Sequence, residues 1–478
     1  MNFSLLSLEI AIAALAVLLI LLDLWTAPTS KPMLVFVAIA GLVGILAASF
    51  FLEPGGPAMA NSMLAQDGLA LFFQRLFLVT AIFVLLIAHE CADRIPMGIG
   101  EFHVMVLTAL TGMMLAAAAN DLVMVFVSLE LIAVSFYVLV SFQRSRLQSL
   151  EAGVKYLILS ALSAAFLVFG IALIFGTANQ TNFVLLREGA ATLNGNKIYW
   201  LGVLLVLFGL SFKIAAFPLQ VWAPDVYQGA PTPVTALLAI ASKAAGFVLL
   251  LRVLFTAMPD LALRWDRMLM LASGVTILYG NLCAIPQRSL KRLLGYSSIS
   301  NAGYMLLGVA AVNASGSAAI LYYLAGYLFT LAAAFLVISV VLKDNDDISG
   351  LAGLSRRSPL LAAALALAMV SLAGIPPLAG FLGKFLLLRA IIEQGATDSA
   401  CYWLAGVAVI GVVISLYYYF AVIRVMYWAK DPADLSPISA PSRVRISLAV
   451  CMAGMLYLGI FPSAILASAT EAVKALKF

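Results

Sequence analysis

The chain has 478 residues, of which 64% are hydrophobic and only 10% are charged, and its formal net charge is +5. Soluble domains usually carry about a quarter charged residues, so this composition excludes a water-soluble globular protein. The basic residues are spread over short segments and form no stripe, which excludes a nucleic-acid-binding surface. We therefore predict an all-α integral membrane protein.

Apolar runs follow one another along the whole chain. A bilayer core of about 30 Å needs roughly 20 apolar residues per helix, which predicts about fourteen membrane helices. The runs are residues 3–25, 33–52, 68–89, 102–119, 121–142, 150–176, 199–223, 233–256, 268–286, 295–313, 316–342, 359–393, 402–428 and 444–466. The first run is expected to be a retained helix, because no basic segment precedes it and no cleavage site follows it. The longest connections, 177–198 and 429–443, are predicted to be polar loops.

An even number of spans places both termini on one side of the membrane. Loops on the opposite side carry about twice as many Lys and Arg residues, and such loops normally face the cytoplasm. We therefore expect both termini on the periplasmic side of a bacterial inner membrane.

Charged residues also fall inside the predicted membrane helices. They are Glu130, Lys155, Lys213, Lys243 and Lys384. A charge near the bilayer centre costs roughly 3 to more than 10 kcal/mol, so such residues normally face a bundle interior or a wet cavity. They could be structural ion pairs, but too few carboxylates accompany the lysines. A desolvated lysine releases its proton readily, so the excess of lysine favours a proton relay. Arg75 and Arg252 are assigned structural roles, because guanidinium stays protonated.

Prolines interrupt two of the runs close to a lysine. Pro218 follows Lys213 in the seventh run, and Pro376 and Pro377 precede Lys384 in the twelfth. Proline removes a backbone donor and frees a carbonyl, which membrane helices tolerate only where protein or water satisfies it. An ordinary kink is the alternative, but the coincidence with a lysine in both runs favours a functional break.

The two broken runs lie five helices apart, which predicts an internal repeat. Helices 4–8 and 9–13 would be two five-helix units, inverted in the membrane because five is odd. The domain organisation would then be a three-helix segment at 1–100, the first repeat at 101–257, the second repeat at 258–430 and a C-terminal helix at 431–478.

Several stretches are similar to a known family of membrane subunits. They are SLELIAVSFYVLVSFQR, SLEAGVKYLILSALSAAFLVFG, FKIAAFPLQVWAPDVYQGAPTPVTALLAIASKAAGF, LKRLLGYSSISNAGYMLLG, YYLAGYLFTLAAAFLVISVV and SLAGIPPLAGFLGKF, together covering roughly residues 120–390. The chain resembles subunit N of bacterial NADH–quinone oxidoreductase, respiratory complex I, in the antiporter-like family. The Lys and Pro pattern is shared with multi-subunit cation/proton antiporters, whereas PDVYQGAPTPV is more specific to subunit N.

The resemblance implies a proton-translocating subunit in the membrane arm of a quinone-reducing enzyme complex. Glu130 and Lys213 would form the pair in which the carboxylate modulates the lysine. Lys243 would be the central relay residue, Lys384 the exit-side residue, and Lys155 would lie near the cytoplasmic intake. Water chains would join these groups, and each charged lysine would disfavour protonation of the next.

One residue departs from the family pattern. Many relatives carry histidine where SISNAGY has Asn301, and an amide can hold a water chain but cannot titrate. This argues against a histidine proton step on that helix. The neighbouring hydroxyls of Tyr296, Ser297, Ser298 and Ser300 could line a polar path or could simply bond helices together.

The resemblance also gives expectations for cofactors and partners. NADH, FMN, iron–sulfur clusters and ubiquinone or another quinone would be bound by other subunits, with no cofactor in this chain. The four cysteines form no CxxC pair, so no metal site is expected. Expected partners are the antiporter-like subunit M, the small subunit K and membrane lipids, but no nucleic acid.

Two other functions stay open. One is a subunit of a multi-subunit cation/proton antiporter, against which PDVYQGAPTPV and Lys384 in GFLGKF argue. The other is a purely structural membrane scaffold, which would have little use for Lys213 and Lys243 at the centre of the bilayer.

Overall fold

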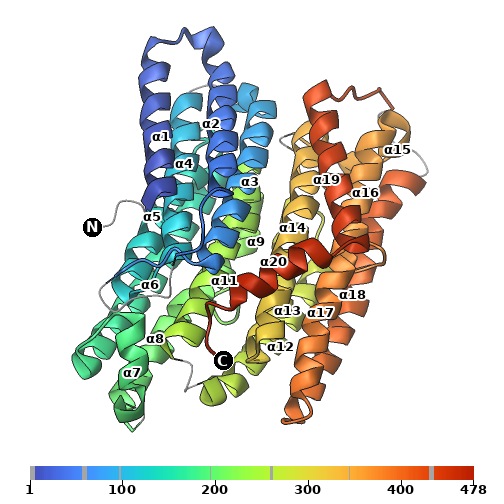
Figure 1. The fold of residues 1–478 in the computed structure, drawn as a ribbon. Coiled ribbons are helices and arrows are strands. Elements are labelled where there is room, and N and C mark those ends of the chain that lie inside the picture. Colours follow the sequence, from blue (N-terminus) through green and yellow to red (C-terminus); the bar gives the residue numbers. More distant parts are fainter. Residues whose placement is uncertain are drawn as a thin grey trace. The chain divides into compact units, whose positions relative to one another are not determined.

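The computed structural model describes residues 6–55, 62–95, 98–193, 195–258, 262–343, 345–429 and 435–478, and these are predominantly helical (Figure 1). Among them, 12 helices are long and apolar enough to cross a membrane, and two shorter apolar helices cover Pro359–Ala373 and Ser463–Val473. The prediction of an all-α integral membrane protein is confirmed. The count of about fourteen spans, set by bilayer thickness, and the two repeats stay predictions.

The elements have the following bounds. The α-helices are α1 (Ser7–Trp25), α2 (Leu34–Ser49), α3 (Gly68–Glu90), α4 (Ile99–Ala118), α5 (Leu122–Val140), α6 (Leu147–Ala178), α7 (Phe183–Leu193), α8 (Lys197–Ile214), α9 (Trp222–Gly229), α10 (Thr232–Leu237), α11 (Lys243–Arg252), α12 (Ala262–Ala284), α13 (Leu290–Ala310), α14 (Ala314–Val341), α15 (Leu354–Arg357), α16 (Pro359–Ala373), α17 (Ala379–Gln394), α18 (Ala400–Trp428), α19 (Ser442–Ile460) and α20 (Ser463–Val473). The 3₁₀ turns are η2 (Pro28–Met33), η3 (Ala92–Arg94) and η7 (Ile348–Leu351), and η4 (Leu238–Ser242) and η5 (Val253–Ala257) are π-helical.

Short polar side chains begin several of these helices. Asp67 accepts from the backbone N–H of Ala70 at the start of α3, at 2.9 Å. Asp121 does the same for Val123 at the start of α5, at 2.8 Å. Such caps satisfy amide donors that have no partner within the helix, so each marks a helix start.

The prediction of a polar loop at 177–198 is wrong, because helix α7 lies within it. Asn182 caps its first turn by accepting from Val184 N at 3.0 Å. Phe183, Leu186 and Ala190 recur at helical spacing and are buried, and α7 packs against η5. A short amphipathic helix with one narrow apolar face has too little hydrophobicity to stand out in a membrane-span search.

The helices group into two units. The first comprises Met1–Trp222, Gly229–Met268 and Ser468–Phe478, and the second comprises Ala223–Gln228 and Leu269–Ala467. The domain boundaries at residues 100, 257 and 430 stay predictions.

In the first unit, α1 to α4 lie side by side, and packing continues from α4 through α5 and α6 to α8 (Figure 1). The continuous helical segment Thr232–Ala257 is wholly buried, and its α11 packs against both α4 and α8. This segment is therefore the centre of the unit.

Arg252 ties the end of α11 to the surrounding helices. It is 1% exposed, and its guanidinium donates to both oxygens of Asp67, at 3.1 and 2.7 Å. Its Nε also donates to the Ala117 carbonyl at 2.6 Å. A buried guanidinium with such a complete set of acceptors is a fixed structural charge, as the sequence predicts.

In the second unit, α14 packs against α13, α16, α17 and α19, and α18 packs against α16 (Figure 1). Tyr322 of α14 donates to the Leu458 carbonyl of α19 at 2.5 Å. This places α14 at the centre of the second unit, beside the second broken helix.

Candidate functional site

The first predicted break lies between α8 and α9. After Ile214 the chain turns through Ala215, whose φ of 56° is in the left-handed region. Ala216 N then donates back to Ser211 O at 2.9 Å, and Leu219 N donates to Ala216 O at 3.0 Å. These bonds end the helix inside the apolar run and keep most of the freed backbone groups satisfied.

The second break lies between α16 and α17. Gly374 follows the last helical residue, Ala373, and has a φ of 83°. Ile375 N donates to Val370 O at 3.3 Å, and Leu378 N donates to Ile375 O at 3.3 Å. The backbone thus ends α16 in the same way as it ends α8, with a residue of positive φ followed by an N–H that bonds back to the last helical turn.

The two breaks match residue for residue. Ala215 corresponds to Gly374, and Pro218 corresponds to Pro377, with the same spacing and the same backbone hydrogen bonds in each. The matching construction supports the predicted correspondence of the seventh and twelfth runs.

A side-chain donor bonds a carbonyl of the last helical turn at each break. Phe212 O accepts from the indole Nε1 of Trp222 at 3.0 Å. Leu372 O accepts from Nζ of Lys384 at 2.7 Å. At the second break, therefore, the candidate relay lysine itself satisfies the backbone that the break leaves open.

Lys213 lies in the last turn of α8 and is 6% exposed. Its Nζ donates to Tyr156 Oη of α6 at 3.4 Å and lies 5.6 Å from the ring centre of Phe136 of α5. Both partners are aromatic and neutral, so the ammonium is held in place by a weak hydrogen bond and a cation–π contact.

Glu130 and Lys213 line the same small cavity. It has a volume of about 20 Å³ and is bounded by residues of α5, α6 and α8. Among the described residues no direct ion pair joins the two side chains. A volume of this size holds about one water molecule, which could hydrogen-bond to both groups. The geometry therefore allows a carboxyl–water–amine path at the first break.

Lys243 is the first residue of α11 and is 2% exposed. The π-helical turn η4 ends directly before it. Single π turns widen a helix locally, shift the direction of the next side chains and often mark functional sites. The turn therefore sets where Lys243 points within the wholly buried helix.

Gly246 brings α11 close to the broken end of α8. A Cβ added there would lie 2.6 Å from Ile214 Cγ2 and 3.3 Å from the Lys213 carbonyl carbon. Only glycine fits at that distance without a shift of the Ile214 side chain or of the helix that carries it. The close approach places the helices of Lys213 and Lys243 in direct contact.

Replacing Gly246 by alanine is expected to lower proton pumping several-fold, because the added methyl pushes α11 away from Lys213 at a cost of about 1–3 kcal/mol. Shortening Ile214 to alanine in the same chain should restore most of the loss, since Ile214 Cγ2 is the nearest atom. Gly176→Ala is the matched control, because an added Cβ there meets nothing within 4 Å. Pumping in proteoliposomes measures all three; equal loss in the double variant would contradict the contact.

Lys384 lies in α17 and is 4% exposed. Besides Leu372 O, its Nζ faces the ring of Tyr304 of α13, 4.7 Å from the ring centre. A Cβ at Gly374 would come within 3.1 Å of Lys384 Cδ. The left-handed glycine at the break therefore also makes room for the lysine side chain.

Asn301 joins a chain of hydroxyl groups in the second unit. Tyr323 Oη donates to Asn301 Oδ1 at 2.8 Å, and Asn301 Nδ2 donates to Ser297 Oγ at 3.4 Å. Ser297 Oγ in turn bonds Tyr419 Oη at 2.5 Å. The buried amide is thus held by partners on both sides, and it links hydroxyls of α14, α13 and α18 without itself exchanging a proton.

Lys155 differs from the other lysines. Its side chain is 42% exposed and pairs with Glu151 one turn earlier, at 2.7 Å. Glu130 and Lys213 are brought together, Lys243 lies on the adjoining helix, and Lys384 occupies the second unit. Lys155 lies apart from half-buried Glu130 and the three buried lysines, on the surface of α6.

Sequence reasoning missed the neutral partners of the lysines. Tyr156, Trp222 and Tyr304 each contact the site, yet each lies among many aromatic residues of a membrane protein. Tyr156 directly follows Lys155, and only its burial distinguishes it. For metals, no group of three or more His, Cys, Asp or Glu side chains gathers among the described residues.

Comparison with known proteins identifies the family. Residues 119–415 match the transmembrane family of NADH:quinone oxidoreductase and Mrp antiporters. The chain is 37% identical over 465 residues to NADH-quinone oxidoreductase subunit N of Moorella thermoacetica, covering 97% of this chain and 96% of the relative. The chain belongs to the subunit N family of NADH-quinone oxidoreductase. The resemblance inferred from the sequence is therefore confirmed.

Solved structures agree with this family. A chain of respiratory complex I from Thermus thermophilus with bound aureothin is 33% identical, with a TM-score of 0.81, covering 96% of this chain and 98% of that one. A chain of the Mrp complex from Dietzia sp. DQ12-45-1b also has a TM-score of 0.81 but is 21% identical, covering 100% and 98% of the two chains. The latter similarity is one of fold alone. The fold is shared with the Mrp complex, so it is the sequence similarity to the subunit N family that distinguishes this chain from the antiporters.

Proposed function

We propose that this chain translocates protons as subunit N of an NADH–quinone oxidoreductase, through Glu130, Lys213, Lys243, Lys384 and bound water. The observation that carries the relay is the cavity shared by Glu130 and Lys213 beside the first broken helix. Lys243, on the helix that packs against that break, and Lys384, which caps the second break, extend the path.

Each residue has a role in proton transfer that follows from the groups around it. Glu130 stabilises the charged form of Lys213 when it is ionised, and a water between them lets the proton move. A proton leaving Lys213 favours protonation of Lys243, because two charged lysines on adjoining helices repel each other. Loss of charge at Lys384 weakens its bond to Leu372 O, so its protonation state is coupled to the backbone of the break.

The rest of the enzyme supplies the redox chemistry. NADH, FMN, iron–sulfur clusters and the quinone would be bound by other subunits, and no redox group is assigned to this chain. The family places the chain in a membrane arm with other subunits, and we propose subunits M and K as its neighbours. Both termini would face the periplasm of a bacterial inner membrane, in line with the Lys and Arg bias. Lys155 would lie at the cytoplasmic intake.

Glu130→Gln tests this function in the assembled complex reconstituted into proteoliposomes. The amide keeps the size of the carboxyl but cannot ionise, so NADH-driven pumping should fall about tenfold. A tenfold decrease corresponds to a rise of roughly 1.4 kcal/mol in the activation free energy of proton transfer. Pumping by the wild-type complex should be the same in sodium-free and sodium-containing buffer. A requirement for sodium would instead support a cation/proton antiporter, and wild-type pumping by Glu130→Gln would contradict the relay.

A further inference from the structure

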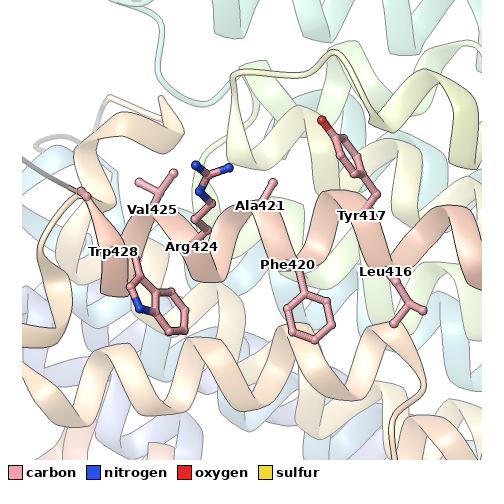
Figure 2. Close-up of a pocket in the computed structure, with 8 residues that line it drawn as sticks. Leu416, Tyr417, Phe420, Ala421, Arg424, Val425 and Trp428 are labelled. Atoms are coloured by element: carbon pink, nitrogen blue, oxygen red, sulfur yellow. The ribbon is translucent and has the colours of Figure 1, made fainter.

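A wide groove opens along the C-terminal part of α18. Its volume is about 1180 Å³, and its described lining residues lie between Leu416 and Ala429 of that helix (Figure 2). Apolar side chains dominate the lining. Figure 2 shows Phe420, Arg424 and Trp428 along α18, and their i, i+4 spacing places them as neighbours on one helix face. The groove thus combines an apolar surface with one cation.

Arg424 is exposed, and among the described residues it has no hydrogen bond or ion pair. By contrast, two arginines of the second unit are paired: Arg292 contacts Asp225 at 2.5 Å, and Arg389 contacts Glu393 at 2.7 Å. A guanidinium on a membrane-spanning helix needs an anion or water. The groove therefore offers an open site for a negative group.

The position of Arg424 sets the depth of that site. It lies one turn before Trp428, the last residue of the candidate span Ala400–Trp428. Tyr427 and Trp428 are exposed there, at 40% and 69%, and exposed aromatic residues at the end of a span mark the membrane–water interface. The flexible arginine side chain can therefore reach the level of the lipid headgroups.

The apolar lining continues into the membrane from that level. Leu416 precedes Arg424 by two turns, about 12 Å along the helix, with Phe420 between them. A phospholipid has the same order along the membrane normal, because its charged headgroup lies at the interface and its acyl chains extend into the hydrocarbon core.

A second cation lies on an adjoining element. The short helix α15 packs against α18 and ends in Arg356 and Arg357. Arg356 is exposed and, among the described residues, its side chain has no partner. Two guanidinium groups on packed elements attract an anionic headgroup more strongly than one does, because each adds its own attraction to the anion.

We propose that this groove binds an anionic phospholipid. The guanidinium of Arg424 donates two parallel hydrogen bonds to the phosphate, a geometry that Arg favours and Lys cannot provide. One acyl chain lies along Phe420 and Leu416, and Trp428 packs beside the glycerol region. The site is independent of the proton relay.

The test uses the intact complex, phosphatidylglycerol with a photoactivatable acyl chain, and a matched phosphatidylcholine probe. Crosslinks of phosphatidylglycerol, mapped by mass spectrometry, should lie on residues 416–429. Their yield should decrease about fivefold in Arg424→Gln. Arg389→Gln, an exposed arginine of α17 that is already paired, is the control and should label like the wild type.

Three outcomes would overturn the proposal. Equal labelling by the phosphatidylcholine probe would show general contact with bulk lipid. Equal labelling of Arg424→Gln and wild type would show that the guanidinium binds no headgroup. Absence of labelling at 416–429 in the intact complex, with labelling elsewhere, would show that a partner subunit fills the groove.

Discussion

Replacing Lys213 by alanine is expected to lower NADH-driven proton pumping at least about tenfold while the membrane arm still assembles. Alanine carries no proton, and a positioned acid or base typically contributes 100-fold or more to a proton-transfer step. The change also removes the group that faces Glu130 across their shared cavity. Dye quenching in proteoliposomes measures pumping, and native gel electrophoresis measures assembly.

Lys197→Ala is the matched control for this loss. Lys197 lies at the opposite end of the same helix and is exposed. Its removal changes the charge of α8 by the same amount and should leave pumping close to the wild-type rate. Wild-type pumping by an assembled Lys213→Ala complex would remove Lys213 from the relay.

Replacing Lys243 by arginine is expected to stop pumping nearly as completely as replacing it by glutamine. Arginine keeps the positive charge but does not release its proton at physiological pH, whereas glutamine has neither property. If the residue must give up a proton, both variants fail; if a fixed charge suffices, arginine alone survives. Pumping by the two assembled complexes, compared at equal amounts in the membrane, decides between these roles.

The steric effect of arginine has its own control. Lys243 is fully enclosed, so a bulkier side chain could disturb the π turn before it. Lys243→Met is unbranched, uncharged and slightly shorter than lysine, so it should fold with the native packing and separates loss of the charge from added bulk. An inactive methionine variant together with an active arginine variant would reject a proton relay at this position.

The sequence predicts the charged members of the site because their signal is local. A lysine in an apolar run, such as Lys213 or Lys384, stands out by the cost of its burial. Pro218 and Pro377 likewise mark breaks that proline chemistry requires. The contacts of the lysines could not be predicted. Tyr156 lies 57 residues from Lys213 in the chain, and the sequence pattern does not show that two such distant residues are close in space.

The sequence predicts that the two breaks correspond, but it does not predict that their backbones match residue for residue. Ala215 and Gly374 occupy the same left-handed position, yet alanine gives no sign of a positive φ. The matching bonds join backbone groups, so they persist while the side chains differ. This explains how two structurally equivalent turns can have little sequence identity.

The proposal that a proton passes between Glu130 and Lys213 is tested most directly by infrared difference spectroscopy of the complex during NADH oxidation. The relay predicts a carboxyl C=O band that changes on turnover and shifts in heavy water. That band should be absent in Glu130→Gln and altered in Lys213→Ala. Identical carboxyl bands in the wild type and both variants would contradict proton exchange at this pair.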